Sequence, residues 1–319
     1  MRSLRAAVRG LVTYAWLPDG PPRAVLVART PYGAAGHAAE ARGWTAHDVG
    51  LVVQDVRGRH ESPGTFRPYA EDGGPDGPAL TAWVRSWTEA PVVLLGTSYG
   101  AHAALATATQ VEPDGVVVAV PALGLGETAR TRGGVLQLAS RLGWWLAHDV
   151  PRPWSDVLSA RRRDAERALD VASIRCPLLA IGGAYDHFAH DTTDLCAHWG
   201  GPAELAFGPW DHALSGARRA GRTLAWLDLV LDGSPPSSTG RPLTATVHVD
   251  AAAHEQWCAS LLVDGREVAH GAAVGRRITL GPVLDDGPFE LRLATDDFPR
   301  YARAPHAPRP VPDHHLEIA

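Results

Sequence analysis

The chain has 319 residues, a formal net charge of −5, 45% hydrophobic residues and 20% charged residues. This composition is typical of a soluble globular protein, lacks the basic footprint of a nucleic-acid-binding protein, and offers no apolar run of membrane-spanning length. All 30 basic residues are arginine and no asparagine occurs. A pyridoxal-phosphate Schiff base, a P-loop lysine and a Cys-His-Asn triad are therefore excluded.

Short apolar runs alternate with amphipathic stretches over the first two-thirds of the chain. Strands are predicted over 24–28, 50–56, 91–96, 115–121, 177–183 and 203–208. Helices are predicted over 38–48, 76–87, 191–199 and 216–231, with another directly after residue 98. Near-continuous apolar strands separated by helices are typical of a parallel sheet covered on both faces.

Two later segments break this alternation. Residues 122–174 are helical in pattern and rich in arginine. Residues 232–242 have the composition of a linker, and short strand candidates with turns follow them. A small all-β unit is therefore expected at the C-terminal end of the chain.

The stretch "VVLLGTSYGAHAAL", residues 92–105, places a serine between two glycines where a strand becomes a helix. G-x-S-x-G at such a turn is the nucleophile elbow of α/β-hydrolases. The helix that follows Ser98 favours negative charge developing at its N-terminus. An ordinary strand-to-helix turn is the structural alternative.

A nucleophilic serine needs a base, and the base needs an acid that orients it. In α/β-hydrolases these follow the serine in the order acid, then histidine, after later strands. Asp186 follows the predicted strand 177–183, and His212 follows the strand 203–208. Asp211 is the rival acid, but it is too close in sequence to turn back onto the His212 ring easily.

Six segments in order strengthen this interpretation: "ARTPYG" (28–33), "QDVRGRHESPGTFRPYAEDG" (54–73), "GTSYG" (96–100), "GGAYDHF" (182–188), "GPWDH" (208–212) and "TDDFPRYAR" (295–303). Together they resemble the cocaine-esterase / X-prolyl dipeptidyl-peptidase family of acyl hydrolases. The resemblance implies an α/β-hydrolase fold with a helical cap and a C-terminal β jelly roll. We therefore expect a core over 1–121 and 175–233, a small cap over 122–174, and a truncated, sandwich-like β domain over 240–319.

The resemblance also implies roles for individual residues. Ser98 is the nucleophile, Asp186 the acid and His212 the base. The Tyr32 hydroxyl and the Tyr99 backbone N–H form the oxyanion hole, a reasonable use of an uncharged phenol donor. Phe188 matches an aromatic residue that lines the acyl pocket. The cap and the β domain are shorter than is usual in the family, which leaves the walls of the pocket and the substrate class open.

The remaining aromatic and charged clusters have two interpretations each. Trp144, Trp145 and Trp154 are expected either to line an acyl pocket or to pack the cap onto the sheet. Arg57 and Arg59 are expected to anchor a loop rather than to bind a carboxylate. A histidine-rich segment offers spacings that suit zinc, although an exposed polar surface explains them without metal. Its candidate ligands are His187, His190, Asp191, Asp194 and His198.

The sequence therefore predicts a serine esterase that needs no metal or cofactor and acts on a small-molecule acyl substrate. No nucleic-acid or membrane partner is expected, and a homo-oligomer is left open. Without a cleavable leader pattern, a cytoplasmic location is expected. The alternatives are a biosynthetic acyltransferase or cyclase with the same triad, an X-Pro-type aminopeptidase, and a non-enzymatic binding module.

Overall fold

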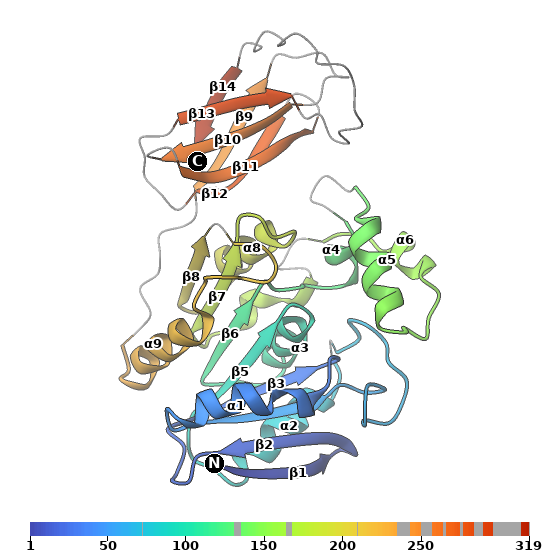
Figure 1. Cartoon of the computed structure of the whole chain (residues 1–319), viewed down its shortest axis with the longest axis vertical. Helices are drawn as coiled ribbons and strands as arrows, with labels where there is room; N and C mark the ends of the chain where they lie inside the picture. Colours follow the sequence, from blue (N-terminus) through green and yellow to red (C-terminus); the bar gives the residue numbers. More distant parts are fainter. Residues whose placement is uncertain are drawn as a thin grey trace.

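A computed structural model describes most of the chain: residues 1–71, 73–130, 135–163, 168–208, 210–234, 243–249, 257–263, 266–274, 277–283, 290–295 and 314–318. Its centre is an eight-stranded sheet with the order β1-β2-β4-β3-β5-β6-β7-β8 (Figure 1). The strands are β1 Arg2–Val8, β2 Leu11–Leu17, β3 Ala24–Thr30, β4 Val49–Asp55, β5 Val92–Thr97, β6 Gly115–Ala119, β7 Leu178–Gly183 and β8 Ala203–Gly208.

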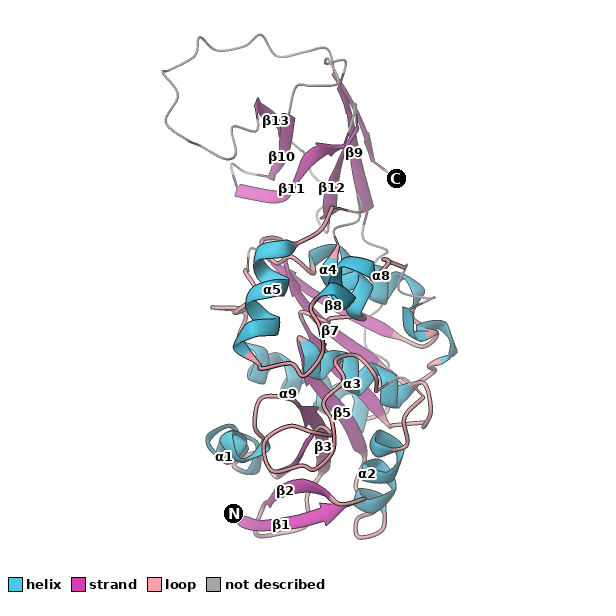
Figure 2. Cartoon of the chain, turned by 90° about the vertical axis from the view of Figure 1, so that its right-hand side faces the viewer, coloured by secondary structure: helices cyan, strands magenta, loops and turns pink. Residues whose placement is uncertain are grey.

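Helices cover both faces of this sheet (Figure 2). One face packs against α1 Ala38–Thr45 and α9 Arg219–Leu231, which contribute Trp44 and Trp226 to its apolar cluster. The other face packs against α2 Asp76–Arg85, α3 Tyr99–Ala108 and α8 Ala189–His198. Every residue of β3 and β4 is buried. The near-continuous apolar runs predicted such doubly covered strands, and the α/β-hydrolase core is confirmed.

The sheet is mixed rather than wholly parallel, which corrects the expectation. Strands β3 to β8 are parallel to their neighbours, but β1 and β2 form an antiparallel hairpin that joins the sheet through β4. The turn of the hairpin uses positive φ angles of 51° at Arg9 and 76° at Gly10. The hairpin was missed because most of β1 is exposed and carries no apolar run.

Between β6 and β7 the chain forms the segment predicted as the cap. It contains α4 Leu125–Ala129, α5 Leu138–Ala147, α6 Ser155–Ser159 and the short η2 Val171–Ser173; a further short turn, η1 Ala34–His37, precedes α1. Figure 1 shows α4, α5 and α6 beside the carboxyl ends of the central strands. Among the described residues, no helix combines the length and the apolar character needed to cross a membrane.

The C-terminal region contains the expected short strands. They are β9 Leu243–Val249, β10 Trp257–Val263, β11 Arg266–Val274, β12 Arg277–Val283, β13 Glu290–Thr295 and β14 His314–Ile318. They pair antiparallel in the order β13-β10-β11-β12-β9-β14. The sandwich-like packing of this region and the domain boundaries stay predictions, and the predicted linker lies largely outside the described residues.

Candidate active site

The nucleophile elbow forms where the sequence predicts it. β5 ends at Thr97, α3 begins at Tyr99, and Ser98 between them has φ 53° and ψ −116°. A positive φ at a non-glycine residue is strained and persists only where the surrounding structure imposes it. A Cβ atom at Gly96 would collide with the backbone of Gly100. The first glycine of the motif is therefore a steric requirement of the turn that lifts Ser98 out of the sheet.

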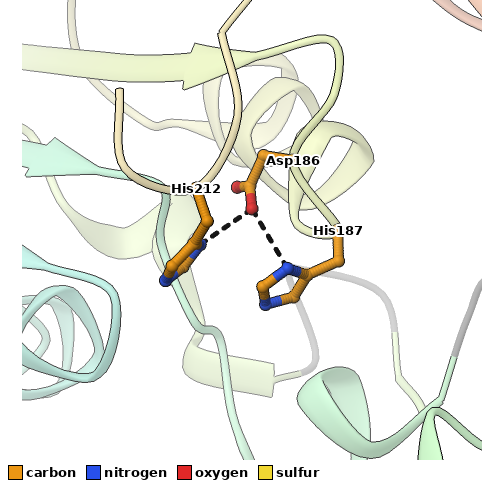
Figure 3. Close-up of side chains that lie close together, drawn as sticks. All are labelled: Asp186, His187 and His212. Atoms are coloured by element: carbon orange, nitrogen blue, oxygen red, sulfur yellow. Dashed lines mark hydrogen bonds and ion pairs between the residues drawn. The ribbon is translucent and has the colours of Figure 1, made fainter. Parts of the chain in front are cut away.

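Two loops bring the predicted base and acid to this serine. His212 Nε2 lies 3.1 Å from Ser98 Oγ. On the other side of the ring, His212 Nδ1 lies 2.8 Å from Asp186 Oδ1 (Figure 3). Asp186 follows β7 and is 6% exposed, and His212 follows β8. Because a carboxylate only accepts, Nδ1 donates to Asp186 and Nε2 is left to accept from the Ser98 hydroxyl.

The rival acid lies elsewhere. Asp211 Oδ1 accepts a hydrogen bond of 3.1 Å from the backbone N–H of Ala213. This contact closes a local turn of a kind that aspartate side chains favour. The structure thus brings Asp186, and not its sequence neighbour Asp211, to the His212 ring.

Two donors flank the serine as the sequence suggested. Tyr99 is the first residue of α3, so its backbone N–H has no partner within the helix and lies at the positive end of the helix dipole. Tyr32 follows β3, and its hydroxyl oxygen accepts a hydrogen bond of 3.1 Å from Trp144 Nε1. Tyr32 is 42% exposed, and the partial burial of its side chain raises the pKa of Tyr32, although Trp144, Ser98 and two arginines oppose the shift. The Tyr32 phenol therefore keeps its proton at neutral pH.

The phenol of Tyr99 is committed away from the serine. Its hydroxyl donates to Glu71 Oε1 at 2.7 Å and accepts from the backbone N–H of Tyr69 at 3.0 Å. Burial, with the negative charge of Glu71, raises the pKa of Tyr99 well above its usual value. Only the backbone N–H of Tyr99 is therefore available to a reacting group.

Comparison with known proteins identifies the family of the chain. Residues 10–168 match the family described as X-Pro dipeptidyl-peptidase (S15 family). This chain belongs to that family. A comparison with curated proteins found no match.

Several solved structures share the fold of this chain over most of its length. A CocE/NonD family hydrolase from Staphylococcus aureus matches with a TM-score of 0.64 at 11% identity, covering 88% of this chain and 82% of the other. The α/β-hydrolase GrgF from Penicillium sp. sh18 matches with a TM-score of 0.51 at 14% identity, covering 73% of this chain and 98% of the other. A 2,6-dihydroxy-pseudo-oxynicotine hydrolase matches with a TM-score of 0.55 at 17% identity, covering 74% and 70%. At these identities the likeness concerns the fold.

The predicted pocket aromatics divide into two groups. Phe188 meets the His212 ring edge-on at 5.6 Å, and Trp144 stacks on Tyr99 at 5.9 Å. Trp145 is 4% exposed and packs inside the cap, and Trp154 is 38% exposed on its surface. The structure thus brings Phe188 and Trp144 to the site but neither of the other tryptophans.

Sequence reasoning missed two side chains that contact the site, Arg141 and His148. The His148 ring packs against Tyr32 at 5.2 Å and against Trp144 at 4.7 Å. Arg141 reaches the loop that carries Asp186. Arg141 lies within α5, and His148 directly follows it. Which residues of this helix point towards the site depends on its rotation about its own axis, and no sequence motif indicates that rotation.

The structure groups a different set of possible metal ligands from the set predicted from the sequence. Nitrogen and oxygen atoms of Asp186, His187 and His212 lie within 4.8 Å of one another, close enough to reach one ion. Of the histidine-rich segment, only His187 belongs to this group. Asp191 pairs instead with Arg162, and His198 Nδ1 lies 2.9 Å from the backbone oxygen of Asp194. The expectation that no metal is needed stays a prediction.

The two arginines of "DVRGR" have structural contacts. Arg57 Nη2 lies 2.8 Å from Asp76 Oδ1. Arg59 Nε donates to the Pro31 carbonyl at 3.1 Å, and its guanidinium also donates to the carbonyl of His148. These contacts favour loop anchoring, and that of Arg59 fastens the cap to the core.

Proposed function

We propose that this α/β serine hydrolase cleaves an acyl ester through a covalent acyl-enzyme formed on Ser98. The observation that carries the proposal is the continuous chain of hydrogen bonds from Ser98 Oγ through His212 to Asp186, at 3.1 Å and 2.8 Å. A nucleophile, a base in hydrogen-bond contact with it, and an acid that orients the base are the three parts that acyl transfer requires.

The reaction follows from these contacts. Ser98 Oγ attacks the ester carbonyl as His212 Nε2 takes its proton, and Asp186 stabilises the imidazolium that forms. His212 then gives the proton to the leaving alcohol, and the carbonyl re-forms as an ester on Ser98. Water attacks this ester with the same histidine as base, which releases the acid and restores the Ser98 hydroxyl.

Two neutral donors support the oxyanion of each tetrahedral intermediate. The Tyr99 N–H is fixed by the first turn of α3, and the Tyr32 hydroxyl is held by Trp144 from the cap. Donors oriented before the reaction stabilise developing charge without reorganising, and loss of one such donor costs about 10²–10³ in kcat.

Charge near the site favours an ester over an X-Pro peptide with a free amino terminus. The charged groups that act on Tyr32 are Arg141 and Arg59, and both are cations. Asp186 is already engaged by His212. Among the described residues around Tyr32, these arginines repel a substrate ammonium group rather than bind it.

A substrate panel tests this choice. Purified protein is compared on p-nitrophenyl esters of short acyl chains and on an X-Pro p-nitroanilide at matched concentrations. We expect ester turnover to exceed anilide turnover by at least about 10²-fold, since p-nitrophenolate leaves more readily than p-nitroanilide and the arginines described around Tyr32 disfavour a substrate ammonium group. Preferential cleavage of the X-Pro anilide would contradict the esterase proposal. Transfer of the acyl group to an added amine faster than to water would instead indicate an acyltransferase.

A further inference from the structure

His187 lies directly beside the proposed triad and has no part in the reaction as written. Its Nδ1 is 3.3 Å from Asp186 Oδ1, the same oxygen that accepts from His212 Nδ1 (Figure 3). The His187 ring also stacks on the His212 ring, with the centroids 4.5 Å apart and the planes 27° apart. Asp186 thus lies between two imidazoles that both approach Oδ1.

The other side of the His187 ring meets the cap. Arg141, on α5, places Nη2 3.1 Å from His187 Nε2. Its guanidinium also lies over the ring of Phe188, at 5.4 Å from the centroid, and Phe188 in turn meets the His212 ring. One cap arginine therefore contacts two consecutive residues of the loop that presents Asp186.

The partners fix the protonation of His187. A guanidinium only donates hydrogen bonds, so Nε2 must accept and the single ring proton lies on Nδ1, which faces Asp186 Oδ1 at 3.3 Å. Burial lowers the pKa of His187 to about 4; the charge of Asp186 opposes this shift, while His212 and Arg141 add to it. A neutral imidazole can make both contacts at once, whereas an imidazolium would lose its acceptor for Arg141.

Asp186 depends on this contact because its other oxygen has little support. Asp186 Oδ2 is buried and has no hydrogen-bond partner among the described residues. The contacts that hold the carboxylate are therefore at Oδ1: the hydrogen bond with His212 Nδ1 at 2.8 Å and the approach of His187 Nδ1 to 3.3 Å. Without His187, the carboxylate is held by His212 alone and can rotate towards a better partner for Oδ2.

We propose that His187 is a positioning residue that ties the cap helix α5 to the triad carboxylate through the path Arg141–His187–Asp186. The proposal rests on the function proposed above. It implies that seating of α5 on the core helps to align Asp186, so that the cap influences the chemical step as well as substrate binding.

Three substitutions of His187 separate its two contacts. His187→Asn places an amide N–H near the position of Nδ1 and so keeps the donor to Asp186 but loses Arg141. His187→Gln reaches the position of Nε2, so it keeps an acceptor for Arg141 and loses Asp186. His187→Phe keeps a ring against His212 and loses both contacts.

The proposal gives an order for these variants on one p-nitrophenyl ester. We expect His187→Phe and His187→Gln to lower kcat by about tenfold or more with KM within about threefold, since orientation acts on the transition state. His187→Asn should recover kcat to within about threefold of wild type.

A double-mutant cycle tests the cap contact. Arg141→Gln should lower kcat by about three- to tenfold in the wild-type background and have almost no further effect in His187→Phe, since residues in one hydrogen-bond path are not additive. Arg152→Gln is the matched control, because Arg152 pairs with Asp156 within the cap, and its effect should be small and additive. Circular dichroism and thermal melting establish that each variant is folded.

The results distinguish a failure of the His187 proposal from a failure of the proposed hydrolase function. A wild-type enzyme that a fluorophosphonate labels on Ser98, combined with a His187→Phe variant within twofold of wild type, overturns this proposal and leaves the hydrolase intact. A His187→Asn variant as impaired as His187→Phe overturns the contact to Asp186. Additive losses for Arg141 and His187 overturn the link to the cap. Absence of Ser98 labelling in the active wild type overturns both proposals.

Discussion

The core and the cap of this hydrolase are held together by different forces. Every residue of β3 and β4 is buried, and the clusters on both faces of the sheet are made of aliphatic and aromatic side chains. The cap has its own apolar cluster and the stacking of Trp144 on Tyr99, but it also depends on contacts of arginines. Arg162 reaches the backbone oxygens of Glu127 and Arg130 and the carboxylate of Asp191, and Arg163 donates to Glu127 Oε1.

This difference suits the core and the cap to different roles in the site. Close packing in the core resists displacement, so it can hold Ser98 at a strained positive φ. Hydrogen bonds hold the cap at a few defined points. Three of them lie beside the site: Trp144 to the Tyr32 hydroxyl, Arg141 to the His187 ring, and Arg59 to the His148 carbonyl. The core therefore presents the proposed nucleophile, and the cap contacts residues that we propose act with it.

Ser98→Ala tests the task of the core most severely. We expect kcat to fall by about 10³-fold or more while the melting temperature stays near that of wild type, because the methyl group fits the same turn and removes only the attacking oxygen. Steady-state rates on the best ester and a thermal melt provide the comparison. A variant that kept more than about a tenth of wild-type activity would remove Ser98 from the mechanism.

Tyr32→Phe tests a core residue whose hydroxyl is hydrogen-bonded to Trp144 of the cap. Loss of its hydroxyl should lower kcat by about 10²–10³ with little change in KM, because the donor acts on the oxyanion rather than on the bound ester. The full dependence of rate on ester concentration gives both constants. A change in KM alone would make Tyr32 a binding residue.

The acid is tested by two adjacent loops of the core. Asp186→Asn should lower kcat by at least about 10²-fold, because an amide favours the wrong tautomer of His212. Asp211→Asn is the control and should cost less than about tenfold, since an amide oxygen can still accept from the Ala213 N–H. Rates at pH 7 and above pH 8 provide the comparison. Greater damage from Asp211→Asn at both would reverse the assignment.

A pair of arginine substitutions tests how the cap is fastened. The Arg162 and Asp191 side chains are 14% and 3% exposed, whereas those of Arg152 and Asp156 are 42% and 26% exposed. Arg162→Gln should lower the free energy of unfolding by about 2 kcal/mol, because it removes the guanidinium that pairs with the buried Asp191 carboxylate. Arg152→Gln should change it by less than about 0.5 kcal/mol. Urea unfolding of both variants measures the difference; equal effects would show that the cap does not depend on the buried pair.

Removal of metal is expected to have no effect. The Nδ1 atoms of His187 and His212 both lie close to Asp186 Oδ1, at 3.3 Å and 2.8 Å, and these contacts account for the proximity of the three side chains without an ion. Incubation with EDTA should leave ester turnover within about 10% of the untreated rate, because no step of the proposed mechanism uses a metal. Time-dependent loss that zinc restores would contradict this expectation.

The sequence predicted the core better than the cap, for physical reasons. The elbow at Ser98 and the loops that present Asp186 and His212 each follow an apolar strand, so their relative positions are set by the topology of a parallel sheet. The hairpin β1–β2 was missed because an exposed edge strand needs no apolar pattern. Trp144, Trp145 and Trp154 were candidates either for the pocket or for packing of the cap, and of the three only Trp144 reaches the site.

The orientation of α5 explains why Trp144 reaches the site and Trp145 does not. Adjacent residues of a helix point about 100° apart, so Trp144 and Trp145 face different surroundings, and composition alone does not distinguish them. The same orientation carries Arg141 towards His187, a contact between segments 46 residues apart. Such long-range contacts depend on tertiary packing and leave no local signature in the sequence.

The central claim, that Ser98 is activated as a nucleophile by His212, is tested most directly by covalent labelling. Wild type, Ser98→Ala and His212→Ala are treated with a fluorophosphonate, and the intact protein and its peptides are analysed by mass spectrometry. The account predicts one adduct per chain on Ser98 in wild type, none in Ser98→Ala, and labelling slowed by about 10²-fold or more in His212→Ala. An adduct on another residue, or equal labelling rates with and without His212, would contradict it.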